Sequence, residues 1–281
     1  MTGTLYVVAT PIGNLGDMVP RAVEILQTVT LIAAEDTRHS GRLLRHLGID
    51  TPMVSYHDRG DEQQIARILA ILAKGDDVAL ISDAGTPLIS DPGYRLVHQV
   101  REQGYSASPI PGPCAAIAAL SAAGLPSDRF IFEGFLPAKQ GERCKRLTAL
   151  IAEERTLVFY EAPHRVLDAL TDIGEVFGQQ RKIVLARELS KAFETFLSGV
   201  SEQLVEIINA DPNQQRGEFV LMIEGAPKRV RNADDAGAEN VLTILTEELP
   251  LKQAVALAAK ITGVNKNSLY QRALELKQSS E

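Results

Sequence analysis

Residues 78–93 read VALISDAGTPLISDPG, an apolar run of four residues that breaks directly into a loop rich in glycine, proline and aspartate. The apolar run is typical of a buried strand. In a parallel sheet, ligands bind in the crevice outside the carboxyl ends of the strands, which is where we expect this loop to lie. Ala84 and Gly85 leave room for a ligand to approach the main chain. The stretch predicts a ligand-binding loop, and an Asx-type turn whose aspartates, Asp83 and Asp91, satisfy local amides is the alternative.

Strand-like and helix-like segments alternate along the first 124 residues. Asp17 is placed to cap the first helix, and Pro20 stands in its first turn, where a missing N–H costs little. Alternating βα units of this kind predict an α/β fold with a parallel sheet covered by helices on both faces. The expected strands are 5–9, 31–34, 53–56, 78–81 and 106–110, and the expected helices are 19–29, 40–47, 63–73, 94–103 and 114–123.

The second part of the chain is patterned differently. Residues 124–127, GLPS, must interrupt the preceding helix and are the expected linker between two α/β domains. The runs 183–187 and 194–198 follow each other without a helix between them, which predicts a mixed sheet with an antiparallel portion. The other strands are expected at 130–135, 156–160 and 218–224, with helices at 145–154, 164–177 and 203–209.

The end of the chain is expected to be helical. Residues 225–237, with Pro227, Lys228, Arg229 and Arg231, are polar and are interpreted as a connection. Helix-period runs at 252–261 and 266–277 flank residues 262–265, which is the outline of a helix-turn-helix. Glu275 is the one acidic residue in residues 251–277, so Lys and Arg are in excess there. This basic excess favours contact with a nucleic acid over a purely structural role. The predicted domains are residues 1–124, 125–226 and 234–281.

The composition is that of an ordinary globular protein, with 281 residues of which 45% are hydrophobic and 23% charged. Two cysteines, Cys114 and Cys144, are too few for a disulfide framework, which indicates a reducing compartment. No signal peptide and no bilayer-spanning run is visible, so we expect a cytoplasmic protein. The dinucleotide fingerprint G-x-G-x-x-G and the P-loop are both missing, and no cluster of residues predicts a metal site.

Six further motifs lie at or beside the expected strands and linkers, in this order along the chain. They are ATPIGN at 9–14, AEDTR at 34–38, PGPCAA at 111–116, FYE at 159–161, RELSK at 187–191 and GEF at 217–219. Together with residues 82–93, they resemble one branch of the tetrapyrrole methylase superfamily, the bacterial ribosomal RNA 2′-O-ribose methyltransferases. The resemblance covers nearly the whole chain. It implies two α/β domains of the tetrapyrrole methylase (class III methyltransferase) type with a cleft between them, and a small C-terminal all-helical domain.

The resemblance also implies an activity and a cofactor. Members of that branch transfer a methyl group from S-adenosylmethionine to the ribose of a cytidine in the decoding region of 16S ribosomal RNA. The implied partners are 16S ribosomal RNA, within the small ribosomal subunit, and a second copy of the chain in a homodimer. The implied cofactor-binding residues, which come from loops of both α/β domains, are Pro11, Asp83, Ala84, Gly85, Pro87, Pro111, Gly112, Cys114, Ala115, Tyr160, Glu161, Gly217 and Glu218.

Transfer to a ribose hydroxyl requires alignment of the reacting atoms and benefits from a group that accepts the proton. Arg38 and Arg187 are expected to hold phosphates, because a planar guanidinium suits phosphate oxygens. We expect the catalytic residues among Glu35, Asp36, Arg38 and Glu188, and the identity of the base stays open. The candidates for it at strand ends facing the cleft are Glu35, Asp36, His57, Glu188 and Lys191.

The formal net charge of −7 argues against a protein that coats nucleic acid nonspecifically, because phosphate contacts need local positive potential. An RNA enzyme of this charge must gather its Lys and Arg in patches. The candidate patches are residues 38–46 and 139–146, and a solvated helix face is the alternative for each.

Two other functions remain open. A methylase of a small tetrapyrrole would use the same fold and cofactor, but a substrate of that size would not require the basic tail. A non-catalytic nucleic-acid-binding regulator built around the helix-turn-helix would leave the cleft loops without a purpose.

Overall fold

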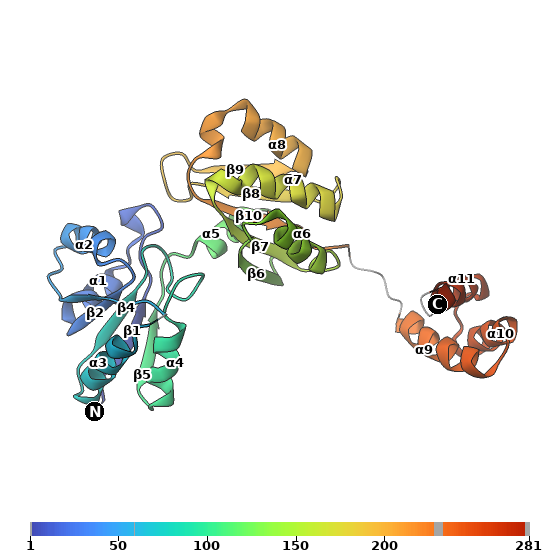
Figure 1. Cartoon of the computed structure of the whole chain (residues 1–281), viewed down its shortest axis with the longest axis horizontal. Helices are drawn as coiled ribbons and strands as arrows, with labels where there is room; N and C mark the ends of the chain where they lie inside the picture. Colours follow the sequence, from blue (N-terminus) through green and yellow to red (C-terminus); the bar gives the residue numbers. More distant parts are fainter. Residues whose placement is uncertain (1, 59, 228–232, 279–281) are drawn as a thin grey trace. The chain divides into compact units, whose positions relative to one another are not determined.

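In the computed structural model, which describes residues 2–58, 60–227 and 233–278, the first half of the chain forms a five-stranded parallel sheet (Figure 1). The strand order is β3-β2-β4-β1-β5. All residues of β2 and β4 are buried, as expected of central strands in a parallel sheet that is covered on both faces. The strands are β1 (Thr4–Val8), β2 (Leu31–Ala34), β3 (Met53–Ser55), β4 (Val78–Ile81) and β5 (Ser106–Ile110).

Helices cover both faces of this sheet. On one face, α1 (Pro20–Thr28) and α2 (Thr37–His46) pack against a core that includes Val8 and Ile32. On the other face, α3 (Glu62–Ala73) and α4 (Tyr94–Glu102) pack against a core that includes Leu5, Leu31 and Leu80. Alternate residues of each strand therefore enter opposite cores. The predicted doubly covered parallel sheet is confirmed.

Two helix starts differ from the sequence-based expectation. The cap of α1 is Val19, and Pro20 is its first residue; Asp17 instead lies in the short 3₁₀ helix η1 (Leu15–Asp17), where it accepts a hydrogen bond from the Ser190 hydroxyl. The prediction of Asp17 as the N-cap was wrong. Helix α2 begins three residues before the expected start, because the Asp36 carboxylate accepts a hydrogen bond from the Arg38 N–H at 2.8 Å and caps the helix there.

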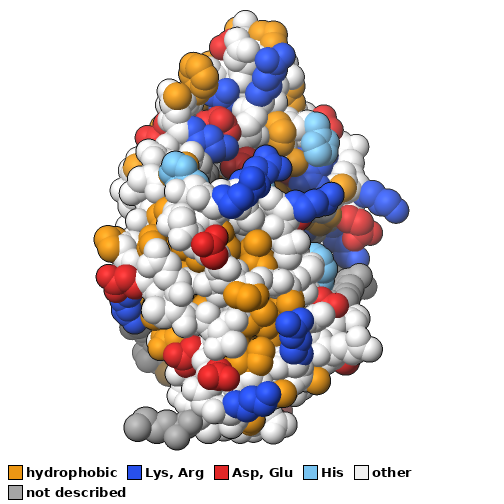
Figure 2. Space-filling view, turned by 90° about the vertical axis from the view of Figure 1, so that its left-hand side faces the viewer, with side chains coloured by type: hydrophobic (Ala, Val, Ile, Leu, Met, Phe, Trp, Pro, Cys, Tyr) orange, Lys and Arg blue, Asp and Glu red, His pale blue; other side chains and the backbone are white. Residues whose placement is uncertain are grey.

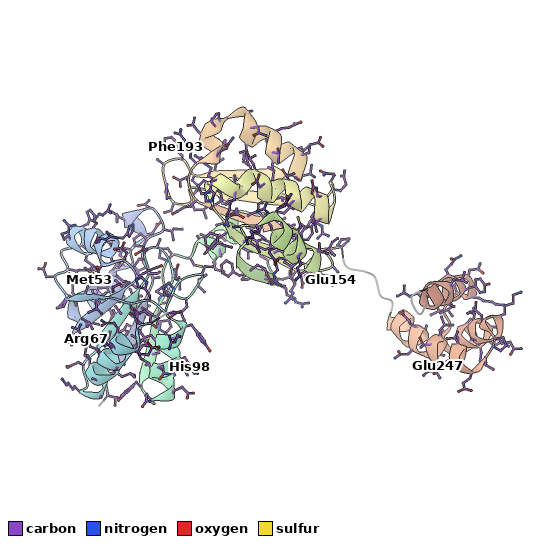
Figure 3. The ribbon with its side chains drawn as sticks, viewed as in Figure 1. Met53, Arg67, His98, Glu154, Phe193 and Glu247 are labelled. Carbon is purple, nitrogen blue, oxygen red and sulfur yellow. The ribbon has the colours of Figure 1, made fainter. Side chains whose placement is uncertain are left out.

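The second sheet is mixed, as predicted, with the order β6-β7-β10-β8-β9. Its first two strands are parallel, and the three remaining pairs are antiparallel. Phe193, labelled in Figure 3, is exposed on the loop that joins β8 to β9. The strands are β6 (Phe130–Phe135), β7 (Thr156–Glu161), β8 (Ile183–Arg187), β9 (Thr195–Gly199) and β10 (Phe219–Ile223).

Helices also cover both faces of the second sheet. One face is packed by α6 (Gln140–Ala149), α7 (Val166–Phe177) and α8 (Ser201–Ala210). The other face is packed by α5 (Ala115–Ala122), which follows β5 in the chain and yet shares its core with β7, β8 and β10. Residues Met1–Ala226 form one compact unit, within which the division at residue 124 stays a prediction. Two short 3₁₀ helices, η2 (Pro163–Arg165) and η3 (Pro212–Gln215), complete it.

The second compact unit, Pro227–Glu281, contains the three helices α9 (Ala233–Glu248), α10 (Leu251–Thr262) and α11 (Lys266–Gln278) in its described part. Gly263 ends α10 in a left-handed conformation, at the expected break. Helix α9, which shares a core with the other two, begins within the segment interpreted as a connection. The basic residues Lys228, Arg229 and Arg231 of that segment lie outside the described residues. Across the described ranges, no helix is long and apolar enough to cross a membrane.

Candidate functional site

The motif loops of the first sheet are joined at its carboxyl edge by hydrogen bonds. The main chains of Thr10 and Gly85 exchange two bonds, at 2.8 and 3.0 Å. The Thr86 hydroxyl donates to the Pro113 carbonyl at 2.9 Å. The Asp36 N–H donates to an Asp83 carboxylate oxygen at 3.2 Å. Four loops that are distant in sequence therefore form one rigid edge, because β2, β4, β1 and β5 are neighbours in the sheet.

A first pocket opens at this edge, with a volume of about 340 Å³. That size is within the range of small-molecule sites, which starts at about 300 Å³. Most of its wall is apolar, and carboxylates stand among the apolar groups. Its lining comes from both sheets and consists of Ile12, Ala84, Gly85, Thr86, Ile89, Ser90, Asp91, Ala115, Phe135, Tyr160, Glu161, Ala162, Pro163, Leu189, Glu218, Phe219 and Val220.

Strained backbone is confined to two loops beside this pocket, among the non-glycine residues that the structure describes. Leu88 and Ser90 in the loop after β4 have φ of 74° and 67°, and Glu188 and Ser190 after β8 have φ of 52° and 67°. Left-handed conformations are unfavourable for residues with a side chain and are found preferentially at functional sites. The strain therefore points to the loops 82–93 and 187–191, which are two of the motifs singled out from the sequence.

Glu161, which lines the first pocket, has an unsatisfied acceptor. Its side chain is fully buried, and Oε1 accepts hydrogen bonds from the Ala162 N–H at 2.7 Å and from Arg165 at 2.6 Å. Oε2 is buried and has no hydrogen-bond partner among the residues that the structure describes. A buried acceptor without a partner is costly, so a ligand that donates a hydrogen bond here relieves that cost. The pocket thus fits a ligand with a hydroxyl or ammonium group.

Tyr160 forms a second wall of the pocket. Its ring packs edge-on against Phe132 and Phe135, with centroids 4.9 and 5.7 Å away. Its hydroxyl oxygen accepts a hydrogen bond from the Ala116 N–H, at the start of α5, at 3.2 Å. Burial raises the pKa of Tyr160 above its ordinary value, so the phenol is neutral at physiological pH. Tyr160 therefore offers an aromatic surface whose position is set by α5.

A second pocket, of about 520 Å³, adjoins the first and shares Ile12, Ala84 and Glu218 with it. Three of its lining residues, His39, Arg42 and His46, are exposed and lie on one face of α2 at spacings of three and four residues. The space-filling view from the side on which α2 lies shows Lys, Arg and His side chains gathered in its upper half (Figure 2). The residues that line the second pocket are Pro11, Ile12, Gly13, Leu15, His39, Arg42, Leu43, His46, Asp83, Ala84, Lys191 and Glu218.

Lys191 reaches the second pocket from the other sheet. Its Nζ pairs with Glu188 Oε1 at 2.8 Å and with Glu218 Oε2 at 3.0 Å. Burial opposes ionisation of Lys191, but the two carboxylates outweigh it and raise its pKa. Burial likewise opposes ionisation of Glu188, but hydrogen bonds from Lys191 and from the Glu218 N–H hold its pKa below the ordinary value. Gly217 stands against the Glu188 side chain, where a Cβ would lie 2.5 Å from Cδ.

The structure brings most of the expected cofactor-binding residues to one place. Six of them line the first pocket, and Pro11 and Asp83 line the second. Gly112 packs against Ala9 with no room for a side chain, and Cys114 is the residue before α5. The six are Ala84, Gly85, Ala115, Tyr160, Glu161 and Glu218, and the residues that line neither pocket are Pro87, Pro111, Gly112, Cys114 and Gly217.

The expected catalytic residues have different surroundings. The Glu35 carboxylate accepts a hydrogen bond from the Asp83 N–H at 3.5 Å; burial raises its pKa, and the charge of Asp83 adds to the effect. Asp36 caps α2, and hydrogen bonds from Arg38 lower its pKa to about 2. Arg38 pairs with that carboxylate, and 89% of its side chain is exposed. His57 is exposed beside Ser55 and lines neither pocket.

Two arginines are not available to phosphates in this fold. Arg187 is buried, and its guanidinium donates to the carbonyls of Arg216, Phe193 and Asn213. The expectation that Arg187 holds a phosphate was therefore wrong. Arg143, in the second candidate patch, is 3% exposed and pairs with Asp172 at 2.5 Å. The patch 139–146 therefore does not present the charge of Arg143 to solvent, because α6, which begins at residue 140, directs the Arg143 side chain into the core.

Several pocket residues were not among the cofactor-binding residues expected from the sequence. Asp91, Ser90 and Thr86 belong to the loop after β4 that was emphasised, so their place in the chain was a usable signal. Phe135 and Val220 lie at sheet positions that resemble ordinary core residues. Nothing local distinguishes a strand residue that lines a pocket from one that packs inside. In the described part of the chain, no group of His, Cys, Asp and Glu is arranged to hold a metal ion.

Two protein-family models match this chain. The model described as tetrapyrrole (corrin/porphyrin) methylases matches residues 4–205. The model described as an RsmI C-terminal HTH domain matches residues 232–277. Together they confirm the predicted fold class, with two α/β sheets and a helical C-terminal domain.

Close relatives align over nearly the full length. A protein of Pseudomonas aeruginosa named ribosomal RNA small subunit methyltransferase I is 58% identical over 277 residues, which are 97% of each chain. The protein of the same name from Escherichia coli O157:H7 is 54% identical, over 97% of this chain and 95% of its own. A solved uroporphyrin-III-C-methyltransferase from Thermus thermophilus superposes with a TM-score of 0.56 at 21% identity, over 79% of this chain and 94% of that one, which shows a shared fold.

Proposed function

The chain belongs to the tetrapyrrole (corrin/porphyrin) methylase family, and from this premise we propose that it 2′-O-methylates the ribose of a cytidine in the decoding region of 16S ribosomal RNA. S-adenosylmethionine is the methyl donor. When bound, it supplies a methyl group on a positively charged sulfur. The observation that carries the proposal is the pair of adjoining pockets. Carboxylates and no Lys or Arg of the described residues line the first, whereas Arg42 and Lys191 line the second beside Asp83 and Glu218, and a cationic donor and an anionic strand need different surroundings.

We place the donor in the first pocket. Ala84, Gly85 and Ala115 let it lie against the main chain, and Tyr160 offers a flat apolar surface. The free Oε2 of Glu161 accepts a hydrogen bond from a hydroxyl or ammonium group of the ligand. The strained loop 82–93 keeps this shape before the donor arrives, so less ordering is required on binding.

We place the RNA strand in the second pocket. His39, Arg42 and His46 on α2, with Lys191 from the opposite side, provide donors for phosphate oxygens. Glu188 holds Lys191 in position, and the exposed Arg38 extends the cationic edge. The acceptor ribose then meets the donor where the pockets share Ile12, Ala84 and Glu218.

We propose that Glu35 is the general base that accepts the proton of the ribose hydroxyl. Its carboxylate interacts with Asp83, which lines the second pocket, and with Asp91, which lines the first. A raised pKa makes it a stronger base than an ordinary glutamate. Glu188 and Asp36 both have lowered pKa values, so their carboxylates are weaker bases. Asp36 instead fixes the start of α2 and thereby the cationic face of that helix.

The C-terminal unit and the assembly complete the proposal. Lys260 and Lys266 flank the break between α10 and α11, Lys252 lies at the start of α10, and we assign this unit to RNA contact. We further propose that the protein acts in the cytoplasm as a homodimer and that its substrate is the RNA within the small ribosomal subunit.

The test is transfer of radiolabelled methyl groups to small subunits, to naked 16S RNA and to a porphyrin, followed by nuclease mapping. We expect label in one cytidine of the RNA, on a ribose whose 3′ linkage resists alkali because its 2′ oxygen is blocked. A chain that ends at Ala226 should keep donor binding and lose RNA affinity. Label in the porphyrin alone, or in a base, would contradict the proposal, and no transfer to any substrate would favour a non-catalytic regulator.

Replacing Arg42 with alanine is expected to weaken RNA binding and to lower the slope of log K against log salt concentration by about 1, because one phosphate contact is lost. Donor affinity should not change. Filter binding at several salt concentrations measures the slope. Arg45→Ala is the matched control, since Arg45 lies on the same helix and bonds the Gly41 carbonyl instead of lining the pocket. Equal slopes for both variants would exclude Arg42 from the interface.

A further inference from the structure

Asp91 differs from the other carboxylates of the first pocket in its partners. Glu161 is paired with Arg165, and Glu218 is paired with Lys191. Asp91 forms no ion pair with a Lys or Arg in the described ranges, and no cation contributes to its electrostatic surroundings. It is partly buried, and it follows Ser90, whose left-handed backbone fixes where the loop directs it. The loop therefore holds an uncompensated negative charge at the pocket wall.

The surroundings of Asp91 disfavour that charge. The carboxylates of Glu35, after β2, and Asp83, after β4, disfavour the charge, and the Ser82 hydroxyl favours it. The phenol of Tyr160 faces it from β7. Burial, together with the two carboxylates, raises the pKa of Asp91 to about 6. A cation that enters the site stabilises the ionised form of such a partly buried carboxylate.

We propose that the Asp91 carboxylate faces the positive charge of the bound methyl donor and makes the first pocket bind the cationic donor more tightly than the neutral thioether product. This inference rests on the proposed function, which places the donor in that pocket. Donor and product differ by one methyl group and one positive charge. Transfer gives the methyl group to the ribose oxygen, moves the hydroxyl proton to a base and leaves the sulfur its bonding electron pair, so the product has no sulfonium charge for Asp91 to attract.

The inference predicts a pH dependence with a definite sign. Asp91 must be ionised to attract the donor, so donor affinity relative to product affinity rises as the pH rises through about 6. Glu161 and Glu218 also line the pocket, and Glu35, Asp83 and Tyr160 face Asp91. Titration of a group that affects both ligands equally cancels in the ratio of their dissociation constants. That ratio is therefore the quantity to measure.

The experiment is calorimetric titration of the full chain with S-adenosylmethionine and with S-adenosylhomocysteine, at pH 8 and pH 5. At pH 8, we expect Asp91→Asn to reduce the preference for the donor, measured as the ratio of the two dissociation constants, by about tenfold or more. A tenfold change has the free energy of a pKa shift of one unit. The wild-type preference should fall toward that of the variant at pH 5. Asp128→Asn is the matched control, because Asp128 is exposed and lines neither pocket.

Each outcome decides the matter. An unchanged preference in Asp91→Asn overturns the inference, and so does an equal loss of affinity for both ligands, which would make Asp91 a residue that only shapes the pocket. If Asp91→Asn does not fold, the wild-type protein is sufficient, since a preference that is the same at pH 5 and pH 8 also overturns the inference. Failure of the wild-type protein to bind either ligand contradicts the proposed function instead.

Discussion

Valine in place of Gly85 is expected to raise the dissociation constant for S-adenosylmethionine by about 100-fold or more, while the protein stays folded. Gly85 has φ of 81°, which strongly disfavours a β-branched residue, and a Cβ there would lie 3.3 Å from Ile12 Cγ2. The loop would have to move away from Thr10, with which it exchanges two main-chain hydrogen bonds. Calorimetry measures the affinity, and circular dichroism reports the fold.

The control for Gly85 is another glycine of nearly the same conformation. Gly104 has φ of 79°, and no atom of the described residues lies within 4 Å of an added Cβ. It follows α4 and lines neither pocket. Gly104→Val therefore introduces the same backbone strain without touching the first pocket. We expect both variants to lose some thermal stability and only Gly85→Val to lose donor binding. Retention of full affinity by Gly85→Val would refute the assignment of the loop to the donor.

Glutamine in place of Glu35 is expected to slow single-turnover methyl transfer by about 10²- to 10⁴-fold, the usual contribution of a positioned base. Because the wild-type carboxylate must be ionised to accept a proton, its rate should fall as the pH drops through the raised pKa of Glu35. This acidic limb should be missing in the variant. Donor affinity should change little, since Glu35 does not line the first pocket.

Two further variants separate a base from other roles of a carboxylate. Glu24→Gln, on the exposed face of α1, should behave as wild type. Glu188→Gln should weaken RNA binding by loosening Lys191, and it should leave the acidic limb of the rate profile in place. If Glu188→Gln removes that limb and Glu35→Gln does not, the two residues exchange their proposed roles.

Elements with a strong local signal were predictable from the sequence. The strands 31–34 and 78–81 have the same bounds in the structure, because runs of apolar residues next to turn residues leave few alternatives. Helix starts were harder. The prediction placed the start of α2 at residue 40, and the residues 37–39 before it are polar. In the structure, the carboxylate of Asp36 caps the helix, which therefore begins at residue 37. Helix α9 was not among the predicted helical runs, and its first residues are polar and acidic.

The sequence by itself determined the order of the elements and the loops in which the ligand residues lie, because helix and strand periods and turn residues are local properties. Only the tertiary structure decided which of those residues face a pocket and what charges they meet. Arg143 and Arg187 became internal, Lys191 met two carboxylates, and Asp91 lines the first pocket without an ion pair to any Lys or Arg in the described part of the chain. Each of these outcomes depends on neighbours from other strands and helices, whose distance in space no local pattern records.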